Sequence, residues 1–187
     1  MMQQATPSAP EEGADRAERR WATVAIVIVT LFVVMAAFAG VHQATLPQSH
    51  VETADPRTLH LSGEFIESNL GSALEPDGSV MVRGIGQQYS FTPPCILVPT
   101  DTPITFRMTS ADVVHGFLIT GTTINLMLVP GYISSLPARF SSPGERLMPC
   151  HEFCGVGHEG MWGRIKIISR PAFMQMAADA RRLSCDK

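Results

Sequence analysis

The distribution of apolar and polar positions divides this 187-residue chain into two parts. Residues 21–51 contain no Asp, Glu, Lys or Arg, and residues 21–41 form one apolar run, WATVAIVIVTLFVVMAAFAGV. About 20 apolar residues, each rising 1.5 Å along a helix, cross a hydrocarbon core, so this run predicts a single membrane helix. From residue 79 onward, short apolar runs alternate with turns that contain Gly and Pro, which is typical of a β-sandwich or barrel.

The predicted strands are short, apolar and bounded by turn residues. They are Ser79–Ile85, Tyr89–Phe91, Ile96–Val98, Ile104–Met108, Gly116–Thr120, Ile124–Leu128, Ile133–Phe140 and Arg164–Ile168. Residues 143–144, a Pro-Gly pair, are interpreted as a corner before a loop, and residues 60–69 as a short helix. A run that follows Pro171, AFMQMAADARRL, predicts a C-terminal helix with Arg181 and Arg182 in its last turn.

The charges around the apolar run predict the orientation of the membrane helix. Arg16, Arg19 and Arg20 precede the run, and the next basic residue is Arg57. The positive-inside rule therefore predicts a cytoplasmic N-terminus and a C-terminal part on the outer side of the inner (plasma) membrane. A cleaved signal peptide is the alternative, because residues 37–39 read Ala-Phe-Ala. The length of the apolar run favours a retained anchor.

These patterns predict five segments along the chain. They are a disordered cytoplasmic tail (1–20), a transmembrane helix (21–42), an irregular linker (43–78), a β domain (79–169) and a helical tail (170–187). The formal net charge of −3 argues against a nucleic-acid partner, and four cysteines are too few for a disulfide-dense scaffold.

Soft metal ligands gather in residues 148–163, which read MPCHEFCGVGHEGMWG. The candidate ligands are Cys150, Cys154, His158 and Met161, with His115 further upstream. Thiolate, thioether and imidazole together select copper over hard cations. One histidine pair, one cysteine and a methionine would form a blue-copper site, whereas two thiolates on one loop can bridge two copper ions. Zinc bound by Cys2His2 and a Cys150–Cys154 disulfide are less favoured alternatives.

The string C-H-E-F-C-G-V-G-H-E-G-M resembles the binuclear CuA loop C-x-E-x-C-x3-H-x2-M of subunit II of haem-copper oxidases. Residues 110–117 and 121–125 resemble the segment that carries the first histidine in that family. The likeness is strongest to the B-type oxidases, whose subunit II has one transmembrane helix. It implies an all-β, cupredoxin-like Greek-key β-sandwich with an N-terminal transmembrane helix and a short C-terminal helix. The ligands it implies are His115, Cys150, Cys154, His158, Met161 and the main-chain carbonyl of Glu152.

The resemblance also implies a function. CuA would take electrons from cytochrome c and pass them to haem in subunit I, where oxygen is reduced to water with coupled proton translocation. This chain would carry electron transfer and not the oxygen chemistry. A CuA subunit of a nitric oxide reductase and a membrane-tethered cupredoxin carrier are the alternatives. Whether the Glu152 side chain also binds magnesium at the contact with subunit I is left open.

Several residues near the motif have two interpretations. Tyr89 either lies close to the point where electrons would enter from cytochrome c or is a core residue of a strand. The second interpretation is favoured. Trp162 is expected either to pack in the domain or to face the metal site or subunit I. Asp112 is expected either to stabilise a turn or to contact subunit I. His151 is expected to point away from copper. Met108, Met127 and Met148 are expected in the core.

Cys95 and Cys185 lie outside the motif, in a part of the chain expected to be in an oxidising compartment. A disulfide between them would fix the C-terminal tail. The favoured reading is that Cys95 is reduced and buried as a small apolar side chain.

Overall fold

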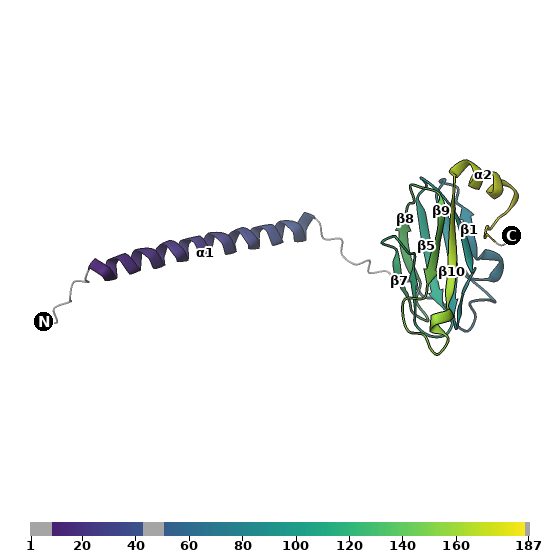
Figure 1. Ribbon diagram of the computed structural model, residues 1–187, viewed down its shortest axis with the longest axis horizontal. Helices are drawn as coiled ribbons and strands as arrows, with labels where there is room; N and C mark the ends of the chain where they lie inside the picture. The colour runs from purple at the N-terminus through teal and green to yellow at the C-terminus, as the bar shows by residue number, and fades with distance from the viewer. Residues whose placement is uncertain (1–8, 43–50, 186–187) are drawn as a thin grey trace. The chain divides into compact units, whose positions relative to one another are not determined.

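The computed structural model describes residues 9–42 and 51–185. It comprises two units, Met1–Ser49 and His50–Lys187. The first unit contains helix α1, Ala9–His42, and the second contains the β domain (Figure 1).

Helix α1 includes a segment, Gly13–Val41, that is long and apolar enough to cross a membrane. All side chains of residues 13–41 are exposed, including the large apolar ones. Apolar surface on this scale is unfavourable in water, and a lipid bilayer is the solvent that suits it. The helix begins at Ala9, so the prediction of disorder is wrong for residues 9–20. This segment contains Ala, Glu and Arg, which favour a helix, and it continues the apolar run. Residues 1–8 and the first part of the linker, 43–50, lie outside the described residues.

The β domain has two main sheets and a hairpin, which confirms the predicted all-β, cupredoxin-like sandwich. The first sheet has the order β1 (Gly71–Leu74), β2 (Val80–Gln87), β5 (Ile104–Ser110), β8 (Ser134–Ala138), with β3 (Ser90–Thr92) also paired to β2. The second has the order β4 (Cys95–Pro99), β10 (Trp162–Ile168), β9 (Gly144–Pro149). Strands β6 (His115–Leu118) and β7 (Asn125–Leu128) form the hairpin. Both sheets are mixed, because β2 pairs with β5 and β4 with β10 in parallel.

Alternating side chains of the two sheets form the core between them. In β10, Ile165 and Ile167 are buried while Arg164 and Lys166 face outward. The same period of two buries Val80 and Val82 in β2 and Ile104 and Phe106 in β5. Phe117 of β6 packs between Phe91 and Phe106, with both ring centroids 5.7 Å away. These aromatic contacts extend the core towards the hairpin.

The segment before β1 is attached to the first sheet by ion pairs and a second apolar cluster. Arg107 of β5 donates from Nη1 to Glu52 at 2.9 Å and from Nη2 to Glu64 at 2.7 Å. Arg83 of β2 donates to the same Glu64 carboxylate at 3.0 Å. The apolar cluster comprises Leu59, Phe65, Leu70 and Ile85. The linker was expected to be irregular. Residues 51–70 are mostly exposed and are attached to the domain by these ion pairs and this cluster, whereas residues 71–74 form β1.

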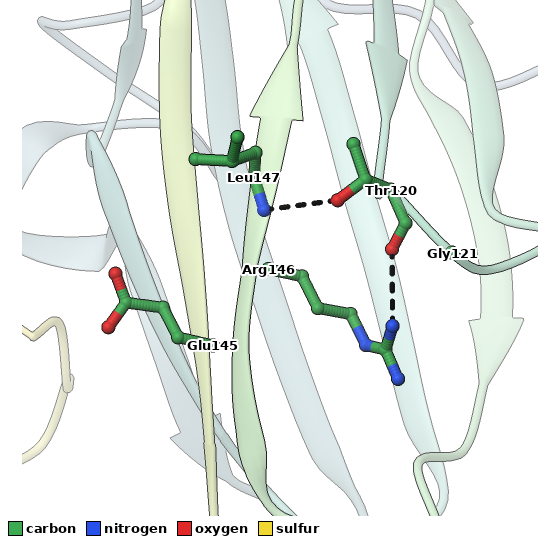
Figure 2. A pocket seen from close by; sticks show the side chains of 5 residues that line it. All are labelled: Thr120, Gly121, Glu145, Arg146 and Leu147. Carbon is green, nitrogen blue, oxygen red and sulfur yellow. Dashed lines mark hydrogen bonds between the residues drawn. The ribbon is translucent and has the colours of Figure 1, made fainter.

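The β6–β7 hairpin is joined to β9 through the loop that follows β6. The Thr120 amide donates to the Leu147 carbonyl at 3.0 Å, and the Leu147 amide donates to Thr120 Oγ1 at 3.2 Å. Figure 2 shows these residues around a pocket into which Arg146 extends, its Nη1 donating to the Thr120 carbonyl at 3.4 Å. The hairpin that begins at His115 is therefore held against the strand that ends next to Cys150.

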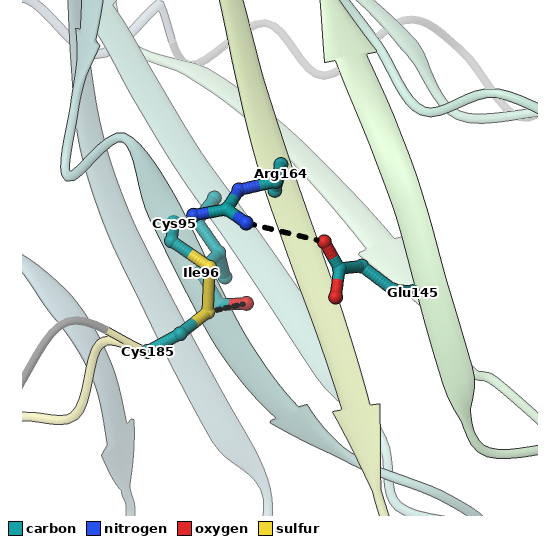
Figure 3. Close-up of a disulfide and its surroundings, with 5 residues drawn as sticks. All are labelled: Cys95, Ile96, Glu145, Arg164 and Cys185. Carbon is teal, nitrogen blue, oxygen red and sulfur yellow. Dashed lines mark hydrogen bonds and ion pairs between the residues drawn. A yellow bond between two sulfur atoms is a disulfide. The ribbon is translucent and has the colours of Figure 1, made fainter.

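The C-terminal tail returns to the sandwich after α2 (Arg170–Asp179). Leu183 exchanges two main-chain hydrogen bonds with Ser72 of β1, and Ser184 pairs with Ile96 of β4. A disulfide joins Cys185 to Cys95, with the Cα atoms 5.3 Å apart (Figure 3). The favoured reading of Cys95 as a reduced thiol is therefore wrong, although Cys95 is buried as that reading expected.

Several other predictions differ from the structure. Strands β1 and β9 were not predicted, and residues 60–69 form turns and a short 3-10 helix, η1 (Glu67–Asn69), instead of an α-helix. Helix α2 ends at Asp179, so Arg181 and Arg182 lie beyond its last turn. Arg182 instead donates to the Asn69 carbonyl at 3.2 Å. Of the three methionines expected in the core, Met127 is half exposed because it faces outward in β7.

Candidate metal centre

The loop between β9 and β10 carries four of the candidate ligands. Cys150 directly follows β9, Cys154 lies in the loop, His158 opens the 3-10 turn η2 (His158–Gly160), and Met161 directly precedes β10. The Cys150 amide donates to the Met161 carbonyl at 3.0 Å. Because β9 and β10 are adjacent and antiparallel, this hydrogen bond closes the base of the loop and fixes its two outer ligands.

The fifth candidate, His115, comes from the start of β6. The His151 amide donates to the Gly116 carbonyl at 2.9 Å, and Phe117 forms a β-bridge with Cys150. A Cβ on Gly116 would lie 2.6 Å from the His151 carbonyl carbon, so only glycine permits this approach. The hairpin and the ligand loop are thereby brought together across 35 residues of sequence.

The structure brings the predicted ligand atoms together in one cluster. The Sγ atoms of Cys150 and Cys154 are 3.8 Å apart. The Nδ1 atom of His115 lies 3.8 Å from the Cys150 sulfur, and Nδ1 of His158 lies 3.6 Å from the Cys154 sulfur. The thioether sulfur of Met161 is 3.8 Å from the Cys154 sulfur. The Glu152 carbonyl oxygen, also predicted, is 3.2 Å from the Cys150 sulfur.

Asp112 fixes the orientation of the His115 ring. Its Oδ1 atom lies 2.8 Å from His115 Nε2, so a proton on Nε2 leaves the Nδ1 lone pair facing the cysteine sulfurs. Burial opposes ionisation of Asp112, but hydrogen bonds from the Gln88 amide, His115 and the Val113 amide outweigh it and lower the pKa of the carboxyl. Asp112 was expected to form a turn or contact subunit I. The sequence spacing of three residues between Asp112 and His115 is the only feature of the sequence that could have indicated that Asp112 orients the His115 ring.

The cluster is shielded from water. His115, Cys150, Cys154 and Met161 are buried, and His158 is partly exposed. Burial, followed by the neighbouring Cys150 thiol, raises the pKa of Cys154 to about 11. The Cys154 thiol therefore resists deprotonation on its own, and a bound cation would stabilise its thiolate.

The aromatic residues beside the loop do not belong to the core. Tyr89 is 41% exposed, so its favoured reading as a core strand residue is wrong. A Cβ on Gly155, whose φ is +133°, would lie 2.7 Å from the Tyr89 hydroxyl oxygen, so the ring extends over the ligand loop. Trp162 is 52% exposed and donates from Nε1 to the Glu159 carbonyl at 2.6 Å. His151 is exposed, with Nδ1 3.3 Å from the Asn125 amide nitrogen.

Gln88 was not identified from the sequence. Its side-chain amide donates to the Cys154 carbonyl, and its main-chain amide donates to Asp112 Oδ2 at 2.7 Å. The hydrogen bond to Cys154 spans 66 residues of sequence, and no motif spacing signals a contact of that kind.

This donor set fits copper better than the alternatives. A disulfide between Cys150 and Cys154 would need sulfur atoms about 2.05 Å apart, whereas the two sulfurs are 3.8 Å apart. A single tetrahedral zinc ion would need both histidines and both cysteines around one point. Only His115, Cys150 and Cys154 have ligand atoms within 4.8 Å of one another among the described residues, and His158 falls outside that group. The soft thioether of Met161 also favours copper.

Comparison with known proteins agrees with this chemistry. A sequence profile described as cytochrome c oxidase subunit II, periplasmic domain, matches residues 81–168. A cytochrome c oxidase subunit 2 of Thermus thermophilus is 30% identical over 152 residues, covering 80% of this chain and 90% of the relative. Another subunit 2 from the same species is 32% identical over 122 residues, covering 65% of this chain and 90% of that relative. A chain of a heme-copper terminal oxidase dimer superposes with a TM-score of 0.51 and 25% identity, covering 81% of this chain and 99% of that chain.

The fold, the anchor helix and the cluster of soft ligands define a membrane-anchored, single-pass protein with a cupredoxin-like copper-binding domain. The chain belongs to the cytochrome c oxidase subunit II family. It is thus a component of a haem-copper terminal oxidase, which is an oxidoreductase.

Proposed function

We propose that this chain receives electrons from a c-type cytochrome at a binuclear CuA centre and passes them to haem in subunit I. There, oxygen is reduced to water with coupled proton translocation. One observation carries the binuclear assignment: His115 approaches the sulfur of Cys150, while His158 approaches the sulfur of Cys154. Two histidines at the two different cysteine sulfurs would provide one imidazole ligand for each of two metal ions that share those sulfurs.

In the proposed site, Cys150 and Cys154 would hold both copper ions through their thiolates, and His115 and His158 would each supply an imidazole ligand. The Met161 thioether and the Glu152 carbonyl would be the remaining ligands. The distances from Met161 to the Cys154 sulfur and from Glu152 to the Cys150 sulfur support their inclusion in the site.

Bound copper would supply one-electron chemistry at this site. The chain's own residues hold the ligands in place and exclude water. Strands β9 and β10 fix the ends of the loop, and Asp112 fixes the His115 ring. Ligands held on a rigid sandwich need little rearrangement when the charge of the site changes, which favours fast electron transfer.

The proposed location is the inner (plasma) membrane, with one span, a cytoplasmic N-terminus and the copper domain on the outer side. The positive-inside rule supports this orientation, because Arg16, Arg19 and Arg20 precede the apolar part of α1. Fusion of a reporter enzyme that is active only outside the cytoplasm to residue 187 would test it, and activity is expected.

The partner proteins would meet the domain near the ligand loop. Phe153 and Val156 are 74% and 90% exposed, and Tyr89 and Trp162 border the same loop. Large apolar side chains that gather around one exposed loop favour contact with a partner protein. The Glu152 side chain is partly exposed, and magnesium at the contact with subunit I stays a prediction because the remaining ligands would come from another chain.

Metal analysis and electron paramagnetic resonance on the full chain in detergent test the copper assignment. We expect two copper ions per chain and a hyperfine pattern from one electron shared by both nuclei. Cys150→Ser should abolish that pattern because one bridging sulfur is lost. His151→Gln, at the exposed histidine between ligands, is the matched control and should retain it. A pattern from a single copper ion would favour blue copper, and zinc alone would reject both copper sites.

The oxidase assignment is tested on the complex copurified with subunit I. Reduced c-type cytochrome should be oxidised with consumption of oxygen, and Cys150→Ser should stop this reaction. Consumption of nitric oxide in place of oxygen would favour the nitric oxide reductase alternative. Failure of any haem protein to copurify would favour a tethered carrier.

A further inference from the structure

Three segments that are distant in sequence meet beside the cysteine sulfurs. They are the turn after β2 (residues 88–89), the loop before β6 (residues 111–114) and the ligand loop (residues 150–161). Gln88, in the first segment, is hydrogen-bonded to both of the others.

The hydrogen bonds of Gln88 lead to two different ligands. Its side-chain Nε2 donates to the main-chain carbonyl of Cys154. Its main-chain N–H donates to Oδ2 of Asp112 at 2.7 Å, and Oδ1 of the same carboxylate lies 2.8 Å from His115 Nε2. Gln88 thus connects the segment that orients His115 with the peptide that carries Cys154.

The ligand loop also lies in close contact with this residue. A Cβ on Gly155 would lie 2.8 Å from Gln88 Nε2 and 2.7 Å from the Tyr89 hydroxyl oxygen. The loop therefore cannot move towards the turn after β2. The hydrogen bond from Gln88 to Cys154 opposes movement in the other direction.

We propose that Gln88 is a positioning residue that fixes the Cys154 peptide relative to Asp112 and His115. This inference rests on the copper function proposed above. When the amide of Gln88 is lost, the 154–155 peptide can rotate, and the Cys154 sulfur moves relative to the His115 side of the centre. Residues that orient metal ligands from outside the site typically change metal affinity by about 10–100-fold.

Two variants remove the donor while preserving the shape of the side chain. Gln88→Met has similar length and no N–H group, and Gln88→Glu is nearly isosteric and, when ionised, accepts only. Gln88 is exposed, so neither change opens a cavity in the core. The main-chain bond to Asp112 remains, so the effect should fall on the Cys154 side. Gln87→Met changes the same residue type at the last position of β2 and is the matched control.

The first test uses the copper-loaded full chain in detergent. We expect Gln88→Met and Gln88→Glu to load copper, to show an altered hyperfine pattern, and to lose Cu(I) to a chelator about tenfold faster than the wild type. Gln87→Met should match the wild type in both measurements. An unaltered hyperfine pattern and rate in both Gln88 variants would overturn the proposal, as would a lowered melting temperature with an unaltered pattern.

The second test uses the metal-free chain and separates this inference from the copper function. Alkylation of Cys154 should be about tenfold faster in the Gln88 variants than in Gln87→Met, because the loop opens more often. Equal rates would overturn the positioning role. If the wild-type chain fails to bind two copper ions while the alkylation rates differ, the copper proposal fails and the positioning of Cys154 by Gln88 stands.

Discussion

The Nε2 atom of His115 lies 2.8 Å from Oδ1 of Asp112, and the opposite ring nitrogen faces the Cys150 sulfur. The carboxylate thus selects which nitrogen is available to a metal. We expect Asp112→Asn to retain copper, with an affinity about 10–100-fold lower, because an amide holds the ring less firmly. Competition with a Cu(I) chelator measures the affinity. Asp101→Asn, at an exposed turn of the same domain, is the control. Equal affinity in Asp112→Asn and the wild type would contradict this role.

Met161 and His158 both contact Cys154 but should differ in importance. Thioether is a weak ligand in copper sites of this class, whereas imidazole is a principal one. We expect Met161→Leu to keep both copper ions and shift the reduction potential, and His158→Ala to lose copper. Redox titration and metal analysis measure these outcomes. Equal and complete loss of copper in both variants would be inconsistent with this ranking.

The Cys95–Cys185 disulfide should stabilise the domain without affecting copper. It closes a segment with a sequence separation of 90 residues, and disulfides of this kind typically contribute about 2–4 kcal/mol. We expect the Cys95→Ser/Cys185→Ser double variant to unfold at lower denaturant concentration by that free energy. Its copper content should equal that of the wild type. Unchanged stability would mean that the hydrogen bonds of Leu183 and Ser72 hold the tail without the covalent link.

Glu64 should make the stability of the domain depend on pH. Partial burial opposes its ionisation, but the hydrogen bonds and charges of Arg107 and then Arg83 outweigh burial and lower its pKa from the ordinary value of 4.5. The unfolded chain therefore binds the proton more readily than the folded one. The stabilisation is fully present well above pH 4.5 and is lost as the pH falls through the folded-state pKa.

Thermal unfolding of the full chain at several pH values checks this expectation. Glu64→Gln should lower the melting temperature at about pH 7, and its difference from the wild type should shrink below about pH 4.5. Glu67→Gln, at an exposed carboxylate of η1, is the control and should track the wild type. A constant difference between Glu64→Gln and the wild type at all pH values would refute the assignment.

The sequence predicted most of the sandwich because its strands are short apolar runs bounded by turns that contain Gly and Pro. It did not predict β9, whose residues GERLMP include two charged side chains and are fully buried only at Met148. Alternation in β7 in fact identifies Met127 as outward-facing, since Leu126 and Leu128 are buried on either side. The alternating pattern therefore already contradicted the prediction that Met127 lies in the core.

The candidate ligands were predicted from their types and spacing because four of them lie on one loop. The sequence placed Asp112 three residues before His115, but it did not show which ring nitrogen of His115 the carboxylate contacts. Gln88 could not be predicted at all. Its contact with Cys154 depends on how the turn after β2 approaches the ligand loop, and only the folded arrangement of both sheets determines that approach.

The return of the C-terminal tail has a consequence for the surface of the sandwich. Strands β1 and β4 each end a sheet, and an end strand presents free N–H and C=O groups that can recruit another chain. Leu183 forms hydrogen bonds with the main-chain groups of Ser72 in β1, and Ser184 pairs with Ile96 in β4. The disulfide holds this part of the tail against both strands. Residues 183–185 thus protect these two sheet edges from strand addition and aggregation.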